Sequence, residues 1–153
     1  MRAVAARVES AAVTLRDGAC SGQRREIGRG LLVLLGIGPA DGEESAKKLV
    51  DKLLALRIFA NPDGKFDRSV LDERGEILLV SQFTLYGSLK GGRRPDFTGA
   101  ARPETAKPLY ERVAALLAAS GLEVKTGEFG ASMKVESAND GPVTILLDSR
   151  KTF

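Results

Sequence analysis

The chain contains no histidine and no tryptophan, and it has a single cysteine. Without histidine it has no Ser-His-Asp or Cys-His triad, no imidazole base and no histidine-ligated metal site. The one cysteine, Cys20, cannot form an internal disulfide or a cysteine-rich zinc site, and its polar surroundings indicate a free cytosolic thiol. Much of familiar hydrolase chemistry is therefore excluded.

Long hydrophobic runs are also missing. The longest apolar run, Leu31–Leu35, is far too short to cross a bilayer, and the first ten residues lack the apolar segment of a signal peptide. We therefore expect a cytoplasmic protein without a membrane partner. The net charge of +3 permits an anionic partner without requiring one.

What the chain does contain is the composition of a globular protein. With 43% hydrophobic and 28% charged residues, no linker and no repeat, it predicts one domain over residues 1–153. Two helices are expected, one from the capping box at Asp41 to about Phe59 and one from near Pro103 to Ser120, with Pro108 awkwardly inside the second. About seven strands are expected, at Arg2–Val8, Ala11–Leu15, Leu31–Leu35, Glu76–Leu85, Leu122–Thr126, Met133–Ser137 and Val143–Leu147.

These elements predict an α/β fold, a single domain of mixed β-sheets with two helices packed on the sheet. The run Leu31–Leu35 is continuously apolar, which is typical of a strand that is covered on both faces.

Polar side chains follow the apolar residues Ile77–Val80, in the segment Ser81-Gln82-Phe83-Thr84. Polar residues at the end of a strand are frequent in functional sites. An edge strand with solvated hydroxyls explains the same pattern, and this segment alone does not decide between the two.

The segment Asn139-Asp140-Gly141-Pro142-Val143-Thr144 predicts a turn that enters a strand, because Asn and Gly tolerate positive φ and Pro lacks an amide donor. An ordinary turn is the simpler interpretation. The Gly-Pro bond has one further property. It takes the cis form at modest cost, and this orients two consecutive carbonyl oxygens in a way that a trans bond does not.

A third polar segment, Lys90-Gly91-Gly92-Arg93-Arg94-Pro95-Asp96-Phe97, is a basic loop. Glycines next to arginines are able to contact phosphates. The segment has no G-x-x-x-x-G-K-[ST] pattern, so a nucleotide-binding P-loop is not expected.

Taken in order, the first two segments resemble the signature motifs SQxT and NxGPxT of the D-aminoacyl-tRNA deacylase family. Either motif alone is weak, but both at this separation in a chain of this length are specific. Two departures, Ala6 where the family often has Gln and the polar stretch Glu136–Ala138, bear on local packing. The resemblance covers essentially the whole chain, with further matches at Arg7-Val8, Gly30–Gly36, Arg57–Phe59, Arg94–Phe97 and Gly127–Val135.

The resemblance implies a three-layer β/β/α fold and an enzyme that hydrolyses the ester between a D-amino acid, or glycine mischarged on tRNA-Ala, and the terminal adenosine of tRNA. It implies no metal and no other cofactor. It also implies a homodimer with active sites at the dimer interface. This chemistry suits a chain without histidine, because an aminoacyl ester is already activated and positioning with oxyanion stabilisation supplies the rest.

The resemblance further implies how chirality is selected. In the family a cis Gly-Pro segment of one subunit enters the site of the other. In this chain Gly141 and Pro142, between Asn139 and Thr144, would offer two carbonyl oxygens to the substrate's amino group and exclude an L side chain by a backbone clash. Broad acceptance of D-amino acids, and of glycine, follows.

Three more residues are implicated by the resemblance. Phe129 and Met133 are expected to wall the adenosine pocket, although both also fit a hydrophobic core. Arg7 is interpreted as the residue that fixes the Gly-Pro loop, against the alternative of a solvated surface arginine.

Among Ser81, Gln82, Phe83 and Thr84, the predicted catalytic residues, the nucleophile is left open. The Thr84 hydroxyl would need a nearby base, and there is no histidine to act as one. In the alternative, the substrate's 2′-hydroxyl activates water while backbone N–H groups around Phe83 and Thr84 hold the oxyanion. We favour the second route.

Two other function classes fit less well. A non-catalytic tRNA- or RNA-binding module would need exposed aromatic residues for stacking, and aromatic residues make up only 5% of the chain. A serine esterase would need a G-x-S-x-G elbow and a histidine, and neither is present.

Overall fold

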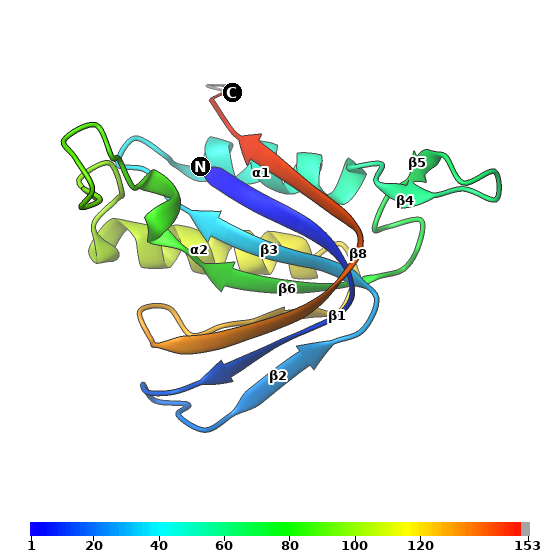
Figure 1. The fold of residues 1–153 in the computed structure, drawn as a ribbon, viewed down its shortest axis with the longest axis horizontal. Coiled ribbons are helices and arrows are strands. Elements are labelled where there is room, and N and C mark those ends of the chain that lie inside the picture. The colour runs from blue at the N-terminus through cyan, green and yellow to red at the C-terminus, as the bar shows by residue number, and fades with distance from the viewer. Residues whose placement is uncertain (151–153) are drawn as a thin grey trace.

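The computed structural model describes residues 1–150, so residues 151–153 of the predicted domain lie outside the described part. The main sheet contains β1 (Arg2–Leu15), β2 (Arg24–Ile27), β3 (Gly30–Gly36), β6 (Glu76–Ser81), β7 (Val124–Thr126) and β8 (Met133–Asp148). Its spatial order is β2-β1-β3-β6-β7, with β8 paired to β1, and the sheet curves strongly (Figure 1). A separate hairpin consists of β4 (Phe59–Ala60) and β5 (Phe66–Arg68).

Two helices, α1 (Glu43–Ala55) and α2 (Pro103–Ala118), pack together on one side of the main sheet (Figure 1). Helix α1 connects β3 to β6, and α2 connects β6 to β7. Both strand pairs are parallel, and parallel neighbours require such a crossover. The predicted mixed sheet with two helices on it is therefore confirmed. Neither helix in the described part of the chain is long and apolar enough to span a membrane.

Strands β3 and β6 are buried on both faces, as the apolar run Leu31–Leu35 predicted. Val33 and Leu79 belong to the core under the helices, whereas Leu32 and Leu78 belong to a second core inside the curve of the sheet. The second core also receives side chains from β1 and β2. The helices, the strands β3 and β6, and the curved-over strands β1, β2 and β8 thus form three layers.

The two strands predicted at the start of the chain are a single long strand, β1. Strand β3 pairs with its first half and β2 with its second half, while β8 pairs with both halves along the other edge. A shift of register between Val8 and Ser10 absorbs the interruption at Glu9. The polar pair that suggested a break is therefore an irregularity within one strand.

The predicted turn at Asn139–Thr144 is also part of one strand, β8, which joins the two strands predicted on either side of it. Residues 139 and 144 both pair with β1, and only Arg7 lies between their two partners. Four residues of β8 therefore lie opposite one residue of β1, and such extra residues must leave the ladder. We call residues 140–143 the Gly-Pro bulge.

The backbone of the Gly-Pro bulge departs from strand geometry. Gly141 has a φ of +126°, a conformation that L side chains rarely adopt, and the peptide bond between Gly141 and Pro142 is cis. The sequence pattern located the irregularity correctly, but the flanking strand continues through it.

Helix α1 differs from its prediction at both ends. It begins after Gly42 without a side-chain cap, so Asp41 is not the capping residue. It ends at Ala55 rather than near Phe59, whose buried side chain belongs to the short strand β4.

Helix α2 begins at Pro103, as predicted, and contains Pro108 at an exposed position, but it ends at Ala118 rather than Ser120. The sequence does not predict β2, β4 or β5. These strands are too short for an alternating pattern to be recognised.

Candidate active site

A cavity of about 800 Å³ opens at the carboxyl ends of β3 and β6. Most of its wall is aliphatic or aromatic, and Ser81, Gln82, Thr98 and Arg102 add polar side chains. Ligand sites in α/β proteins commonly lie at this end of parallel strands. The other lining side chains include Leu35, Ile37, Val80, Phe83, Phe97, Phe129, Met133 and Val135.

The segment after β6 turns at the edge of this cavity. The predicted strand Glu76–Leu85 ends at Ser81, and a short 3₁₀ helix, η1 (Phe83–Tyr86), follows. The amide of Gln82 still donates to the carbonyl of Leu35 on β3, at 2.7 Å. Contact with the sheet therefore extends to Gln82, and η1 begins at the next residue.

Three of the four predicted catalytic residues, Ser81, Gln82 and Phe83, line the cavity, and Thr84 follows on η1. The Thr84 side chain is exposed, and its hydroxyl accepts a short hydrogen bond from the amide of Gln82. An amide is not a base, so this contact does not activate the hydroxyl. Phe83 packs edge to face on Phe97, with 5.1 Å between the ring centres.

Phe129 and Met133 also line the cavity, and both are half-buried. Phe129 packs on the core under the helices, where its ring centre lies 5.8 Å from that of Tyr110. Met133 packs on the second core. Each side chain therefore packs on a core on one side and lines the cavity on the other, and the adenosine pocket stays a prediction.

The Gly-Pro bulge lies toward the opposite end of the sheet. Asn139 pairs with Val8 of β1, and the pairs that continue from Val8 through β3 lead to Glu76, the first residue of β6. Ser81 lies five residues further along β6. Five residues correspond to about 16 Å along a strand. Within one chain, the structure does not bring the two motifs together.

Arg7 supports the bulge from behind. Its Nε lies 3.0 Å from the carboxylate of Asp140 and donates to the carbonyl of the same residue at 3.2 Å, and a second N–H donates to the carbonyl of Ile58. Arg7 is only 8% exposed, so it is not a solvated surface residue. The residues predicted to select the substrate are all exposed: Asn139, Gly141, Pro142 and Thr144.

Strand β8 has an open edge. It pairs with β1 on one side, and no strand within residues 1–150 pairs with its other side. Leu146 is 61% exposed and Val135 is 38% exposed on this strand. A long edge strand with exposed apolar side chains is a surface on which another chain can pair or pack.

A profile of the family described as D-Tyr-tRNA(Tyr) deacylase matches residues 4–148. The chain belongs to this family. The family that the two sequence motifs indicated is therefore confirmed, and with it the enzyme class, a D-aminoacyl-tRNA deacylase.

Similar proteins cover the whole chain. Relatives named D-aminoacyl-tRNA deacylase from Anaeromyxobacter dehalogenans (strain 2CP-C) and Koribacter versatilis (strain Ellin345) are each 54% identical over the full length of both chains. A solved structure titled c-Myc DNA Unwinding Element Binding Protein has a TM-score of 0.87 and 42% identity, and the match covers 97% of this chain and 98% of that one. A probable eukaryotic D-amino acid tRNA deacylase has a TM-score of 0.81 at 19% identity over 95% and 97% of the two chains, which shows a shared fold.

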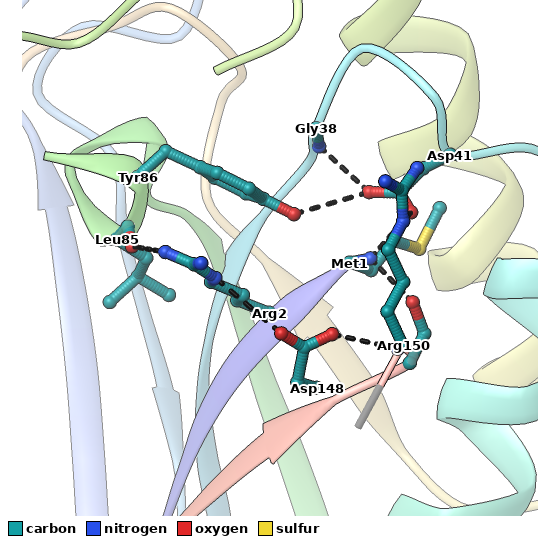
Figure 2. Close-up of polar contacts among 9 residues, drawn as sticks. Met1, Arg2, Gly38, Asp41, Leu85, Tyr86, Asp148 and Arg150 are labelled. Atoms are coloured by element: carbon teal, nitrogen blue, oxygen red, sulfur yellow. Dashed lines mark hydrogen bonds and ion pairs between the residues drawn. The ribbon is translucent and has the colours of Figure 1, made fainter. Parts of the chain in front are cut away.

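In this family member, the far end of η1 is tied to a buried ion pair at the amino terminus (Figure 2). The ammonium group of Met1 lies 2.6 Å from Asp41 Oδ1, and both groups are fully buried. Asp41 Oδ2 accepts hydrogen bonds from the Gly38 amide at 2.7 Å and from the Tyr86 hydroxyl at 3.3 Å. Burial, reinforced by the charge of Asp41, raises the pKa of the Tyr86 hydroxyl, so this hydroxyl stays protonated as a donor.

Arg2 adds a second tie between η1 and the sheet (Figure 2). Its guanidinium group donates to the carbonyl of Leu85 at 3.1 Å, lies over the ring of Tyr86 and pairs with Asp148 at 3.6 Å. Sequence reasoning missed these roles and assigned Asp41 to the start of α1. No local signal reveals them, because the contacts join residues that are far apart in the chain.

The first testable prediction concerns the Asp41 anchor. Replacing Asp41 with Asn leaves the Met1 ammonium buried without a counter-charge, and removing one partner of a buried ion pair costs about 3–5 kcal/mol. Urea unfolding should show that the free energy of unfolding falls by this amount. The matched variant Tyr86→Phe removes one hydrogen bond to the Asp41 carboxylate, which is long at 3.3 Å, and should lose about 1.5 kcal/mol. Equal losses in the two variants would contradict the central role of the ion pair.

Proposed function

We propose that the cavity binds the aminoacyl-adenosine end of D-aminoacyl-tRNA and that the ester is hydrolysed at its rim. The observation that carries this proposal is the position of Ser81–Thr84 at the edge of a largely apolar cavity with Phe129 and Met133 in its wall. A nucleoside needs an apolar slot with a few polar groups to orient it. The cytoplasm is the proposed location, because aminoacyl-tRNA is used there.

In the proposed reaction, the oxygen of a water molecule attacks the carbonyl carbon of the ester. The bond from this carbon to the ribose 3′ oxygen breaks, and the 3′ oxygen takes up a proton. Free tRNA and the D-amino acid leave. During the attack negative charge develops on the carbonyl oxygen, so the site must supply hydrogen-bond donors to that position.

The start of η1 offers such donors. The first hydrogen bond of this helix is the one that the Leu85 amide donates to the Gln82 carbonyl, at 3.2 Å. The N–H groups of Phe83 and Thr84 come before it and have no partner inside the helix. We propose these two N–H groups as the oxyanion hole.

We propose that the substrate's own 2′-hydroxyl orients the water and relays a proton from it to the departing 3′ oxygen. The alternative, attack by the Thr84 hydroxyl, is not favoured. The hydroxyl contacts the Gln82 amide rather than a base, and the chain has no histidine. No metal takes part in the proposed reaction. Within residues 1–150, no three acidic, cysteine or histidine side chains cluster in a way that could hold a metal ion.

We further propose that the Gly-Pro bulge of a second copy completes the site. In one chain the bulge lies far from Ser81 along the sheet, yet it is exposed and held in place by Arg7. The free edge of β8, which carries the bulge, is the surface through which two copies would associate. A symmetric pair would place each bulge at the cavity of the other copy.

In this arrangement the carbonyl oxygens of Gly141 and Pro142 bind the amino group of the substrate, and Asn139 and Thr144 flank the bulge where it joins the ladder. The backbone then occupies the space that an L side chain would need, whereas a D side chain points away from it. Glycine has no side chain to clash, so we propose that Gly-tRNA(Ala) is a substrate as well.

The second prediction tests the activity itself. The purified protein should hydrolyse D-tyrosyl-tRNA and leave L-tyrosyl-tRNA on the same tRNA intact, in the presence of a chelator. In the proposed site, backbone amides stabilise the oxyanion and a backbone clash excludes the L-amino acid. Neither ester hydrolysis nor chiral selection therefore needs a metal. Release of radiolabelled tyrosine measures both rates. Equal rates on the two esters, or activity that returns only with added zinc, would contradict the proposal.

The third prediction concerns assembly. Sedimentation or light scattering at assay concentration should report about twice the chain mass of 16.3 kDa, because each site would need the other copy's bulge. Leu146→Glu places a charge on the open edge and should shift the protein to monomer with loss of deacylation. Lys52→Glu, on the exposed side of α1, is the matched control. A fully active monomer would overturn the cross-subunit site.

The fourth prediction separates the two mechanisms. Thr84→Ala keeps the backbone N–H groups, so it should slow D-tyrosyl-tRNA hydrolysis about tenfold or less, equivalent to roughly 1.4 kcal/mol. If Thr84 were the nucleophile, the same substitution would lower the rate of hydrolysis by several orders of magnitude. A second substrate is a tRNA that ends in 2′-deoxyadenosine and carries D-tyrosine on its 3′-hydroxyl. The enzyme should raise the rate of hydrolysis of this ester only slightly above its spontaneous rate. A trapped acyl-threonine, or undiminished acceleration of the deoxy substrate, would favour Thr84.

A further inference from the structure

The basic loop of the sequence, residues 88–96, follows directly after η1. Backbone hydrogen bonds between Ser88 and Asp96, at 2.8 and 2.9 Å, close the loop into a hairpin-like excursion. Three cationic side chains lie on it, those of Lys90, Arg93 and Arg94, and all three are exposed. The loop therefore displays a local excess of positive charge.

The charges on this loop are not neutralised within the chain. None of its three cations forms an ion pair with a carboxylate in the part of the chain that the structure describes. The one carboxylate of the loop, Asp96, accepts hydrogen bonds from the Thr98 amide at 2.9 Å and from the Thr98 hydroxyl at 2.8 Å. The hydrogen bond from the Thr98 amide lowers the pKa of Asp96. The charged carboxylate is thus engaged with Thr98 and not with the cations of the loop.

Many other surface cations in residues 1–150 form ion pairs, and exposed cations outside the loop that lack one, among them Lys52, Lys65 and Arg74, lie on different elements. Arg112 forms a bidentate contact with Glu43 at 2.7–2.9 Å, and Lys48 pairs with Glu44 at 2.6 Å. What distinguishes the loop is that three exposed cations without an ion pair stand close together, within residues 90–94. Unpaired arginines and lysines in one place favour an anionic partner.

The loop also borders the cavity. Phe97 and Thr98, the residues that follow it, line the cavity, and Phe97 packs against Phe83 of η1. Arg102, a further exposed cation without an ion pair in residues 1–150, lines the cavity from the start of α2. Figure 1 shows the segment between η1 and α2 as loops that project beyond the end of the sheet, on the opposite side of the molecule from the β4–β5 hairpin.

We propose that the loop Ser88–Asp96, with Arg102, binds the phosphates of the single-stranded 3′ end of tRNA, next to the terminal nucleoside in the cavity. This inference rests on the proposed function and names the part of the substrate that the cavity does not hold. The RNA chain attached to a nucleoside in the cavity must pass out through the rim of the cavity. The 5′ phosphate of that nucleoside is then the first anion outside the cavity. Arg93 and Arg94 would each hold a phosphate, and Lys90 would add charge at longer range.

The fifth prediction compares two substrates. The double variant Arg93→Ala with Arg94→Ala should raise KM for D-tyrosyl-tRNA about tenfold near 0.1 M salt with little change in kcat, because it removes two phosphate contacts. The slope of log(kcat/KM) against log salt should become shallower by about 1.4, which is two contacts at about 0.7 each for a single strand. The ester of D-tyrosine with adenosine alone, which has no phosphate, should be hydrolysed at the wild-type rate.

Two controls keep this result interpretable. The double variant Arg93→Lys with Arg94→Lys retains both charges and should keep the wild-type salt slope, because counterion release follows charge. Lys52→Ala removes a cation from the exposed face of α1 and should leave KM and the slope unchanged. All these side chains are exposed, so both variants should keep the core of the parent chain.

The outcomes separate this inference from the proposed function. If the wild type hydrolyses neither substrate, the proposed function is wrong and the loop inference falls with it. If the wild type hydrolyses both and the double alanine variant matches it on D-tyrosyl-tRNA, only the loop inference is overturned. An equal loss on the tRNA and on the adenosine ester would also overturn it, because the loop would then act without phosphates.

Discussion

The pairing of β1 on both of its edges is the constraint on which the rest of this structure depends. One edge binds β3 and then β2, and the other edge binds β8 along almost its whole length. Through β3 this strand places β6 and η1, and through β8 it places the Gly-Pro bulge. Directly before this strand, Met1 forms the buried ion pair with Asp41, which in turn accepts a hydrogen bond from Tyr86 of η1. A change of register in β1 would move every element of the site.

This constraint separates the two signature motifs instead of joining them. Ser81 lies at the carboxyl end of β6, whereas the bulge lies level with the beginning of that strand. What each motif receives is rigid support: η1 is held by Asp41 and Arg2, and the bulge by Arg7. A selection mechanism that relies on a backbone clash needs such rigidity, because a mobile backbone would yield to an L side chain.

Much of the fold follows from local patterns. The apolar run Leu31–Leu35 predicted a strand covered on both faces, and the amphipathic segments predicted both helices. The errors lie where tertiary contacts override a local signal. The sequence pattern predicted Asp41 as a helix cap, but the carboxylate of Asp41 pairs with the buried ammonium group of Met1. The segment Asn139–Thr144 reads as a turn, but β1 continues past it and keeps its flanks in one strand.

The sequence by itself determined the chemistry that is available. It has no histidine, and it carries the SQxT and NxGPxT motifs in order, which was enough to identify the family. Only the tertiary structure decided which residues meet. Arg7 contacts Asp140 across 133 residues, and Tyr86 contacts Asp41 across 45. Such contacts arise from strand pairing between distant segments, and the register of that pairing depends on burying both faces of the sheet at once, which no local pattern encodes.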